Sequence, residues 1–177
     1  MNDVLRLTRA YDFAALKHIG QRRKGDAQEP YVNHLTEVAH LVARATGGAI
    51  PDLVVAAILH DSVEDTDTRL DEIAEAFGAR VAGWVAEVTD DKTLPKAERK
   101  SAQIAHALHA SVGAKIIKLA DKTSNLRALR SSPPKGWPEA RVSEYVVWAG
   151  EVVAGCRGAN AWLEAQFDEA ALALSPG

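Results

Sequence analysis

Residues 53–65 read Leu-Val-Val-Ala-Ala-Ile-Leu-His-Asp-Ser-Val-Glu-Asp, an apolar run that ends in a dense group of polar side chains. On a helix, Glu64 would lie one turn beyond His60. Asp65 would likewise lie one turn beyond Asp61. One imidazole and three carboxylates at the end of a buried helix are electrostatically unfavourable unless a cation lies among them. The segment therefore predicts a central helix with a cation site at its end.

The composition is that of a globular protein with a sizeable core. The chain has 177 residues, of which 47% are hydrophobic, and this suits one domain over residues 1–177. Such a domain buries roughly 70% of its unfolded surface. The net charge of −3 argues against general nucleic-acid binding, so any anionic ligand must be held by local basic groups. The single cysteine, Cys156, excludes a disulfide framework and a cysteine-based zinc site.

The N-terminal residues are polar and lack the apolar region of a signal peptide. No apolar run approaches the roughly 18 residues that a membrane-spanning helix needs. We therefore expect a soluble cytoplasmic protein with no membrane partner.

Apolar residues recur at helical spacing in nearly every segment, and strand-like alternation is scarce. Helices are expected over residues 4–19, 34–45, from Pro51 or Asp52 to the His-Asp pair, 70–77, 81–88, 96–109, 114–130, and in two segments after Pro138. Loops are expected over residues 21–30, 89–95 and 131–138, which are polar or rich in proline and glycine. The sequence thus predicts an all-α bundle of roughly eight to ten helices.

Two helix starts have recognisable capping residues. Asn33 could cap the helix that begins at His34. The segment from Thr68 to Asp71 resembles a capping box for the helix that begins at Leu70.

Metal-ligand residue types occur where apolar neighbours predict burial: His34 at a helix start, His60-Asp61 at a helix end, and Asp121 within a helix. Two imidazoles and two carboxylates suit Mn²⁺ or Fe²⁺ better than an ion selected by thiolates. Four protein ligands around an octahedral ion would leave positions for water and a substrate oxygen, which is typical of a catalytic site. Taken singly, His34 could instead be a helix-capping residue. Asp121 could form a salt bridge on its helix.

Basic and amide side chains near these ligands could bind an anionic substrate. Arg22, Arg23 and Lys24 precede His34 in a polar loop, although a purely solvated loop is the alternative interpretation. Asn125 follows Asp121 by one helical turn and could hydrogen-bond a sugar or a phosphate.

Three motifs occur in a characteristic order, and together they resemble those of the HD-domain phosphohydrolases. They are Tyr-Val-Asn-His at residues 31–34, Leu-His-Asp-Ser-Val-Glu-Asp-Thr at 59–66, and Leu-Ala-Asp-Lys at 119–122. More narrowly, the chain resembles the hydrolase half of RelA/SpoT proteins in its stand-alone form, the small alarmone hydrolases, and within these the metazoan SpoT homologues. The likeness continues through residues 88–96 and 136–145 and covers roughly residues 8–165.

The resemblance implies a helical HD domain that hydrolyses the 3′-diphosphate of guanosine tetraphosphate or pentaphosphate (ppGpp or pppGpp) and releases pyrophosphate. It implies one Mn²⁺ held by His34, His60, Asp61 and Asp121. It assigns Glu64 and Asp65 as the catalytic acidic pair. Lys96 and Arg141 are further substrate-binding candidates by family match, beside Arg23, Lys24 and Asn125. The synthetase and regulatory domains of the family are absent from the chain, so degradation of the alarmone without synthesis is expected.

Two positions depart from the family pattern. Leu35 follows His34 where relatives often have proline, which should alter only the start of the helix. Thr123-Ser124 replaces a bulkier apolar residue followed by an aromatic residue or histidine. Ser124 is near the site by its spacing, so this change bears on base selectivity or active-site packing.

Two other functions remain open on the sequence. One is a phosphatase for NADPH or another nucleotide phosphohydrolase of the HD group, which would keep the chemistry and change the substrate. The other is a nucleotide-binding regulatory module without catalysis. A homodimer is also left open by aromatic residues near Trp137 and Trp148, which we expect to be exposed.

Overall fold

The computed structural model describes residues 2–175, and these residues fold into helices joined by short loops. The ten helices are α1 (Asp3–Lys17), α2 (Val32–Ala45), α3 (Pro51–Leu59), α4 (Ser62–Asp65), α5 (Leu70–Phe77), α6 (Ala79–Val88), α7 (Lys96–His109), α8 (Val112–Ser131), α9 (Glu139–Ala154) and α10 (Ala161–Leu172). Within the described part of the chain, the pairing of extended backbone is limited to one isolated bridge between Arg22 and Pro30. The predicted all-α bundle is confirmed. No helix in residues 2–175 is both long and apolar enough to cross a bilayer.

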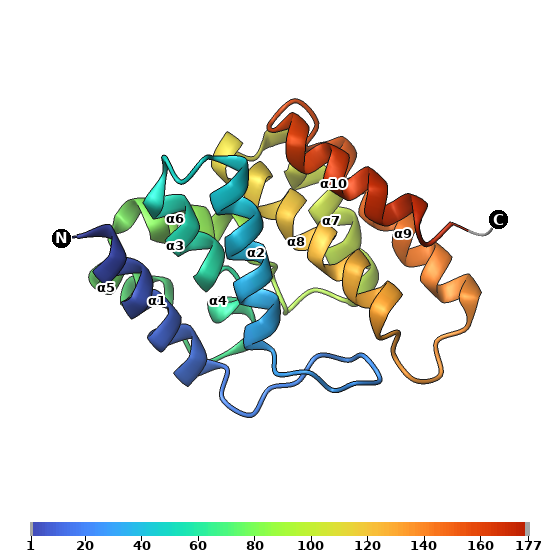
Figure 1. The fold of residues 1–177 in the computed structure, drawn as a ribbon, viewed down its shortest axis with the longest axis horizontal. Coiled ribbons are helices and arrows are strands. Elements are labelled where there is room, and N and C mark those ends of the chain that lie inside the picture. Colours follow the sequence, from blue (N-terminus) through green and yellow to red (C-terminus); the bar gives the residue numbers. More distant parts are fainter. Residues whose placement is uncertain (1, 176–177) are drawn as a thin grey trace.

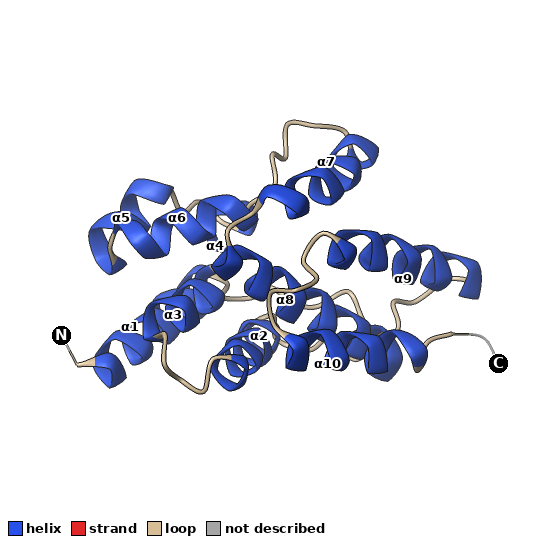
Figure 2. Ribbon diagram, turned by 90° about the horizontal axis from the view of Figure 1, so that it is seen from above, coloured by secondary structure: helices blue, strands red, loops and turns tan. Residues whose placement is uncertain are grey.

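Helix α3 is central, as the apolar run predicted. Every residue from Leu53 to Leu59 is buried, and α3 packs against α1, α2 and α6. Because its whole circumference is apolar, the helix can be covered on all sides. The longest helix, α8, lies beside α2 and continues the core toward α9 and α10 (Figure 1). Helices α5, α6 and α7 lie along one side of the molecule in the view from above (Figure 2).

The expected helix does not run continuously through the His-Asp pair. Helix α3 ends at Leu59, and α4 starts at Ser62 after a turn at His60 and Asp61. The amide of Asp65 still bonds to the carbonyl oxygen of Asp61 at 2.8 Å, so Asp65 lies one turn beyond Asp61.

Both capping predictions are wrong. Helix α2 begins at Val32 with Tyr31 as its N-cap, so Asn33 lies inside the first turn and caps nothing. The backbone is already helical at Tyr31, and the amide of Asn33 bonds to the Pro30 carbonyl at 3.1 Å. Thr68 does not cap α5 either, since the N-cap is Arg69 and the Thr68 hydroxyl pairs with that of Thr66 at 2.8 Å.

Burial in α3 should dominate the stability of the fold. Replacing Leu53, which is 1% exposed, by alanine should lower the free energy of unfolding by about 2–5 kcal/mol through lost burial and a residual cavity. The matched control is Leu108→Ala, at a leucine that is 60% exposed, and it should change that free energy by less than about 0.5 kcal/mol. Urea denaturation of both variants measures the difference, and equal losses would contradict the central position of α3.

Candidate functional site

The predicted site residues gather around one cavity of about 540 Å³. The end of α3, the short α4, helices α7, α8 and α9, and the loop before α2 all contribute to its walls. The lining includes every residue that the sequence singled out: His34, His60, Asp61, Asp121, Glu64, Asp65, Arg23, Lys24, Asn125, Lys96 and Arg141. The structure therefore brings together side chains that are up to 118 residues apart in the chain, from Arg23 to Arg141.

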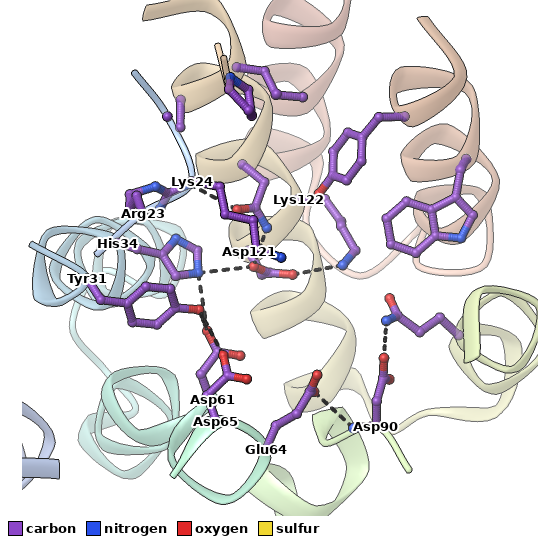
Figure 3. Close-up of a pocket in the computed structure, with 18 of the residues that line it drawn as sticks. Arg23, Lys24, Tyr31, His34, Asp61, Glu64, Asp65, Asp90, Asp121 and Lys122 are labelled. Atoms are coloured by element: carbon purple, nitrogen blue, oxygen red, sulfur yellow. Dashed lines mark hydrogen bonds and ion pairs between the residues drawn. The ribbon is translucent and has the colours of Figure 1, made fainter. Parts of the chain in front are cut away.

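Two buried imidazoles face two carboxylates at the base of the cavity. Nε2 of His34 lies 3.2 Å from Oδ1 of Asp121 and 3.5 Å from Oδ2 of Asp61. Nε2 of His60 lies 3.0 Å from Oδ2 of Asp61 and 3.8 Å from Oδ1 of Asp121. Figure 3 shows His34, Asp61 and Asp121 converging from the start of α2, the α3–α4 turn and the middle of α8.

The outer nitrogens of both rings have acceptors, and this decides where each neutral ring carries its proton. Nδ1 of His60 lies 2.8 Å from the carbonyl oxygen of Ala57, which can only accept. Nδ1 of His34 lies 2.9 Å from the Ser124 hydroxyl, whose own proton goes to Glu37 at 2.7 Å. Each neutral ring therefore directs the lone pair of Nε2 toward the carboxylates.

Nitrogen lone pairs and carboxylate oxygens in contact require a proton or a metal ion between them. Nε2 of His60 is buried and has no hydrogen-bond partner in the described residues, although it lies close to Asp61. Ligand atoms of His34, His60 and Asp121 lie within 4.8 Å of one another. Asp61 is not part of that compact group, and its Oδ2 also accepts a hydrogen bond from the Tyr31 hydroxyl at 2.6 Å. The donor set fits a divalent metal ion.

The pKa shifts within the cluster also indicate a site suited to a cation. Burial would raise the pKa of Asp61, but the imidazoles of His60 and His34 outweigh it and hold that pKa well below its ordinary value. Burial would likewise raise the pKa of Asp121, and Lys122 together with the imidazoles lowers it well below its usual range. Burial disfavours charge on His60, but the two carboxylates hold the pKa of its imidazole well above 6.5. Because a metal would replace a proton at this imidazole, metal binding should release protons.

Asp121 also forms the salt bridge that was its alternative interpretation. Nζ of Lys122 lies 2.9 Å from Oδ2 of Asp121, while Oδ1 faces the imidazoles. The amide of Asn125 donates to that Oδ1 at 2.7 Å, and Asn125 in turn accepts from Arg23 at 3.0 Å. The two interpretations are thus compatible, because the two oxygens of the carboxylate have different partners.

Glu64 and Asp65 lie beside the cluster, on α4. Burial and then the nearby Asp90 carboxylate raise the pKa of Glu64 to about 7, although the Asp90 amide donates to it at 3.1 Å. Asp65 forms an ion pair with Lys92, and its other oxygen lies 3.4 Å from the Tyr31 hydroxyl. A carboxyl group that titrates near neutral pH is suited to proton transfer at physiological pH.

The opposite wall combines cations with aromatic rings. Lys100 and Lys122 each place Nζ 4.8 Å from the ring centroid of Trp148. The guanidinium of Arg141 lies 4.2 Å from the ring of Trp137. Both tryptophans are half-buried and line the cavity, so the aromatic exposure that left a homodimer open is largely directed into the pocket.

Two loops at the rim of the cavity are fastened to each other. The amide of Asp26 donates to the Pro133 carbonyl at 3.1 Å, and the amide of Ala27 donates to the Ser132 hydroxyl at 2.8 Å. A Cβ atom at Gly25 would lie 2.3 Å from the Ser132 carbonyl oxygen, so only glycine permits this approach. The loop with Arg23 and Lys24 is therefore held in place as part of the wall of the cavity.

Several residues that line the cavity or contact its lining were missed by the sequence analysis. Tyr31 is the hydroxyl donor to Asp61, Lys92 pairs with Asp65, and Trp148 contacts the ammonium groups of Lys100 and Lys122. Tyr31 and Lys92 stand inside motifs that were already quoted, so position within a motif was an available signal. Nothing in the spacing of Trp148 distinguishes a pocket ring from a core ring.

Comparison with known proteins settles the family. A family model described as HD domain matches residues 10–150. The chain belongs to the HD-domain family. It is 53% identical over 165 residues to human guanosine-3′,5′-bis(diphosphate) 3′-pyrophosphohydrolase MESH1, covering 92% of this chain and 91% of the human protein. It is 47% identical to the Drosophila melanogaster protein of the same name, covering 89% of this chain and 88% of that one.

A solved structure is also similar to this HD-domain protein. It is described as a metazoan orthologue of SpoT that hydrolyses ppGpp and plays a role in starvation responses. The two folds superpose with a TM-score of 0.89 and 45% sequence identity, covering 93% of each chain. The resemblance to metazoan SpoT-like hydrolases that the motifs indicated is confirmed.

The raised pKa of Glu64 predicts a specific pH dependence of stability. Between about pH 4.5, its ordinary value, and about 7, the folded metal-free protein binds more protons at Glu64 than the unfolded chain does. The stability contributed at this residue is therefore lost as the pH rises through that window. Glu64→Gln should reduce the decline in unfolding free energy, measured by urea denaturation in chelator. Parallel pH profiles of the two proteins would contradict the raised pKa.

Proposed function

We propose that this HD-domain protein is a Mn²⁺-dependent hydrolase of ppGpp and pppGpp that releases pyrophosphate from the ribose 3′ position. The observation that carries the proposal is the paired imidazole lone pairs and carboxylates at the base of a cavity rich in cations. The similarity to MESH1 proteins, named as 3′-pyrophosphohydrolases, supports this substrate. The products would be GDP or GTP and pyrophosphate.

His34, His60, Asp61 and Asp121 would hold the ion. Imidazole nitrogen and carboxylate oxygen donors suit Mn²⁺, and the absence of a thiolate from the cluster removes the preference for softer ions. When bound, such an ion supplies Lewis acidity toward a phosphate oxygen and lowers the pKa of water toward neutrality. Tyr31 restrains Asp61 and Lys122 restrains Asp121, so both carboxylates are oriented before the ion arrives.

Glu64 and Asp65 would orient the attacking water and take its proton. The water oxygen forms a bond to the phosphorus attached to the ribose 3′ oxygen, and the bond between that phosphorus and the 3′ oxygen breaks. The 3′ oxygen then takes up a proton and pyrophosphate leaves. With a pKa of about 7, Glu64 is able both to accept and to return a proton near neutral pH.

The cationic wall would hold the phosphates. Arg23, Lys24 and Lys96 lie on the lining of the cavity, and Arg141 is held against Trp137. Charged donors to phosphate make short, strong hydrogen bonds, which offset the cost of removing a highly charged nucleotide from water. Asn125 already bonds to Arg23 and Asp121, so it links the phosphate-binding loop to the proposed metal ligands.

Turnover should require the ion and its ligands. With Mn²⁺ and guanosine tetraphosphate, we expect the wild type to release pyrophosphate, and His60→Ala and Asp121→Ala to be inactive. A parallel incubation with NADPH tests the alternative phosphatase, which would instead release orthophosphate. The surface variant Leu108→Ala should retain activity as a control. Full activity of either ligand variant in chelator would refute the metal assignment, and inactivity of the wild type on every nucleotide would favour the regulatory module.

Substitution of Glu64 or Asp65 should lower the turnover rate more than it weakens Mn²⁺ binding. Glu64→Gln and Asp65→Asn keep the side-chain shape and remove the basic oxygen, so kcat should fall by about 10²–10⁴-fold. The Mn²⁺ dissociation constant, measured by calorimetry, should change by less than about threefold because neither residue is a proposed ligand. A variant that loses metal binding in proportion to kcat would show that its carboxylate is a ligand instead.

Other expectations from the sequence remain predictions: a single domain over residues 1–177, a cytoplasmic location and a homodimer. Size-exclusion chromatography with light scattering tests the last of these directly.

A further inference from the structure

A chain of hydrogen bonds extends from His34 away from the cavity. Ser124 lies 2.9 Å from Nδ1 of His34 and donates its proton to Oε2 of Glu37 at 2.7 Å. Arg127 donates to the other oxygen of Glu37 at 3.2 Å and to the side chain of Gln166, on α10, at 2.7 Å. The proposed reaction uses none of these side chains beyond His34 itself. These side chains therefore act either through the imidazole of His34 or through the packing of α2, α8 and α10.

The two imidazoles differ in how strictly their hydrogen-bond partners fix the proton on Nδ1. His60 faces the carbonyl oxygen of Ala57, which can only accept, so that ring must donate from Nδ1. His34 faces a hydroxyl, and a hydroxyl can either accept from Nδ1 or donate to it. Ser124 has one proton and is fully buried, so the direction of this bond depends on where that proton goes.

Glu37 removes the ambiguity. A carboxylate only accepts, so it takes the single hydroxyl proton of Ser124. The lone pairs of Ser124 are then left for His34, whose Nδ1 must donate. Nε2 of His34 is thereby kept free of a proton and available as a metal ligand.

We propose that Glu37 is a positioning residue that acts through Ser124 to present the lone pair of His34 to the metal ion. The inference rests on the metal site of the proposed function. Neither residue touches the cavity, since both are outside its lining. Ser124 is also where the chain departs from the family pattern, so the departure replaces a bulky neighbour of His34 with a hydroxyl that needs a directing partner.

The variant Glu37→Gln should reverse the direction of the hydrogen bonds between residue 37, Ser124 and His34. Arg127 only donates, so it retains the carbonyl oxygen of the new amide, and the NH₂ group then faces Ser124. Ser124 would accept from that NH₂ group and donate to Nδ1 of His34. The proton of the neutral ring would move to Nε2, in the position of the metal. A conservative change that does not touch the cavity should therefore be more harmful than deletion of the hydroxyl.

Calorimetric titration with Mn²⁺ at one fixed pH tests this order. Glu37→Gln should weaken Mn²⁺ binding by about 10–100-fold. Ser124→Ala, which leaves Nδ1 without a directing partner, should weaken it by less. The double variant Glu37→Gln/Ser124→Ala should bind Mn²⁺ as tightly as Ser124→Ala does. Adding Ser124→Ala to the Glu37→Gln protein should therefore restore part of the lost Mn²⁺ affinity. Glu75→Gln, at an exposed glutamate of α5, controls for the loss of one negative charge and should leave binding unchanged.

A second route does not depend on Ser124→Ala. Glu37→Leu removes the acceptor without supplying a donor, so its loss of Mn²⁺ affinity should be smaller than that of Glu37→Gln. Thermal unfolding of each metal-free variant checks that the fold is retained.

Three results would overturn the inference. They are unchanged Mn²⁺ affinity in Glu37→Gln, no rescue in the double variant, and equal losses of affinity in Glu37→Gln and Glu37→Leu. The last two results would show that Glu37 acts by its charge or by packing. Failure of the wild type to bind Mn²⁺ would instead refute the proposed metal site, so the two failures are distinguishable.

Discussion

The whole site depends on one electrostatic constraint, the burial of two aspartates against the Nε2 atoms of two histidines. Asp61 and Asp121 come from the α3–α4 turn and from α8, and His34 comes from the start of α2. Removing two carboxylates from water costs several kcal/mol each unless a positive charge compensates. Lys122 and the protonated imidazole of His60 supply that compensation in the metal-free protein, and a divalent ion would replace the proton on His60.

The scaffold holds this cluster in place because the helices around it are apolar where they meet. Helix α3 is buried from Leu53 to Leu59, and α8 carries Asp121 and packs against α10. A well-packed core transmits and resists local strain, because its side chains have little room to rearrange. The polar cluster is therefore fixed by its surroundings, and its residues need only be the right chemical types at the ends and centre of those helices.

The sequence could predict the proposed metal ligands because each is adjacent to an apolar helical pattern whose burial is readable from spacing alone. His60 and Asp61 follow such a run directly, and Asp121 follows another. The partners that orient these ligands could not be predicted in the same way. Glu37 is 87 residues from Ser124, and only the packing of α2 on α8 brings them together. The wrong helix caps have a related cause, because the backbone entered α2 earlier than side-chain preference at Asn33 implied.

The hydrogen bonds between the two rim loops couple parts of the pocket with different tasks. Arg23 and Lys24 lie on the first loop, while Trp137 lies just beyond the segment that Asp26 and Ala27 contact on the second. Any inward movement of the basic loop toward a phosphate would pull the neighbouring loop with it. Either loop could move alone only by breaking these hydrogen bonds, so the basic and aromatic parts of the wall keep a fixed spacing.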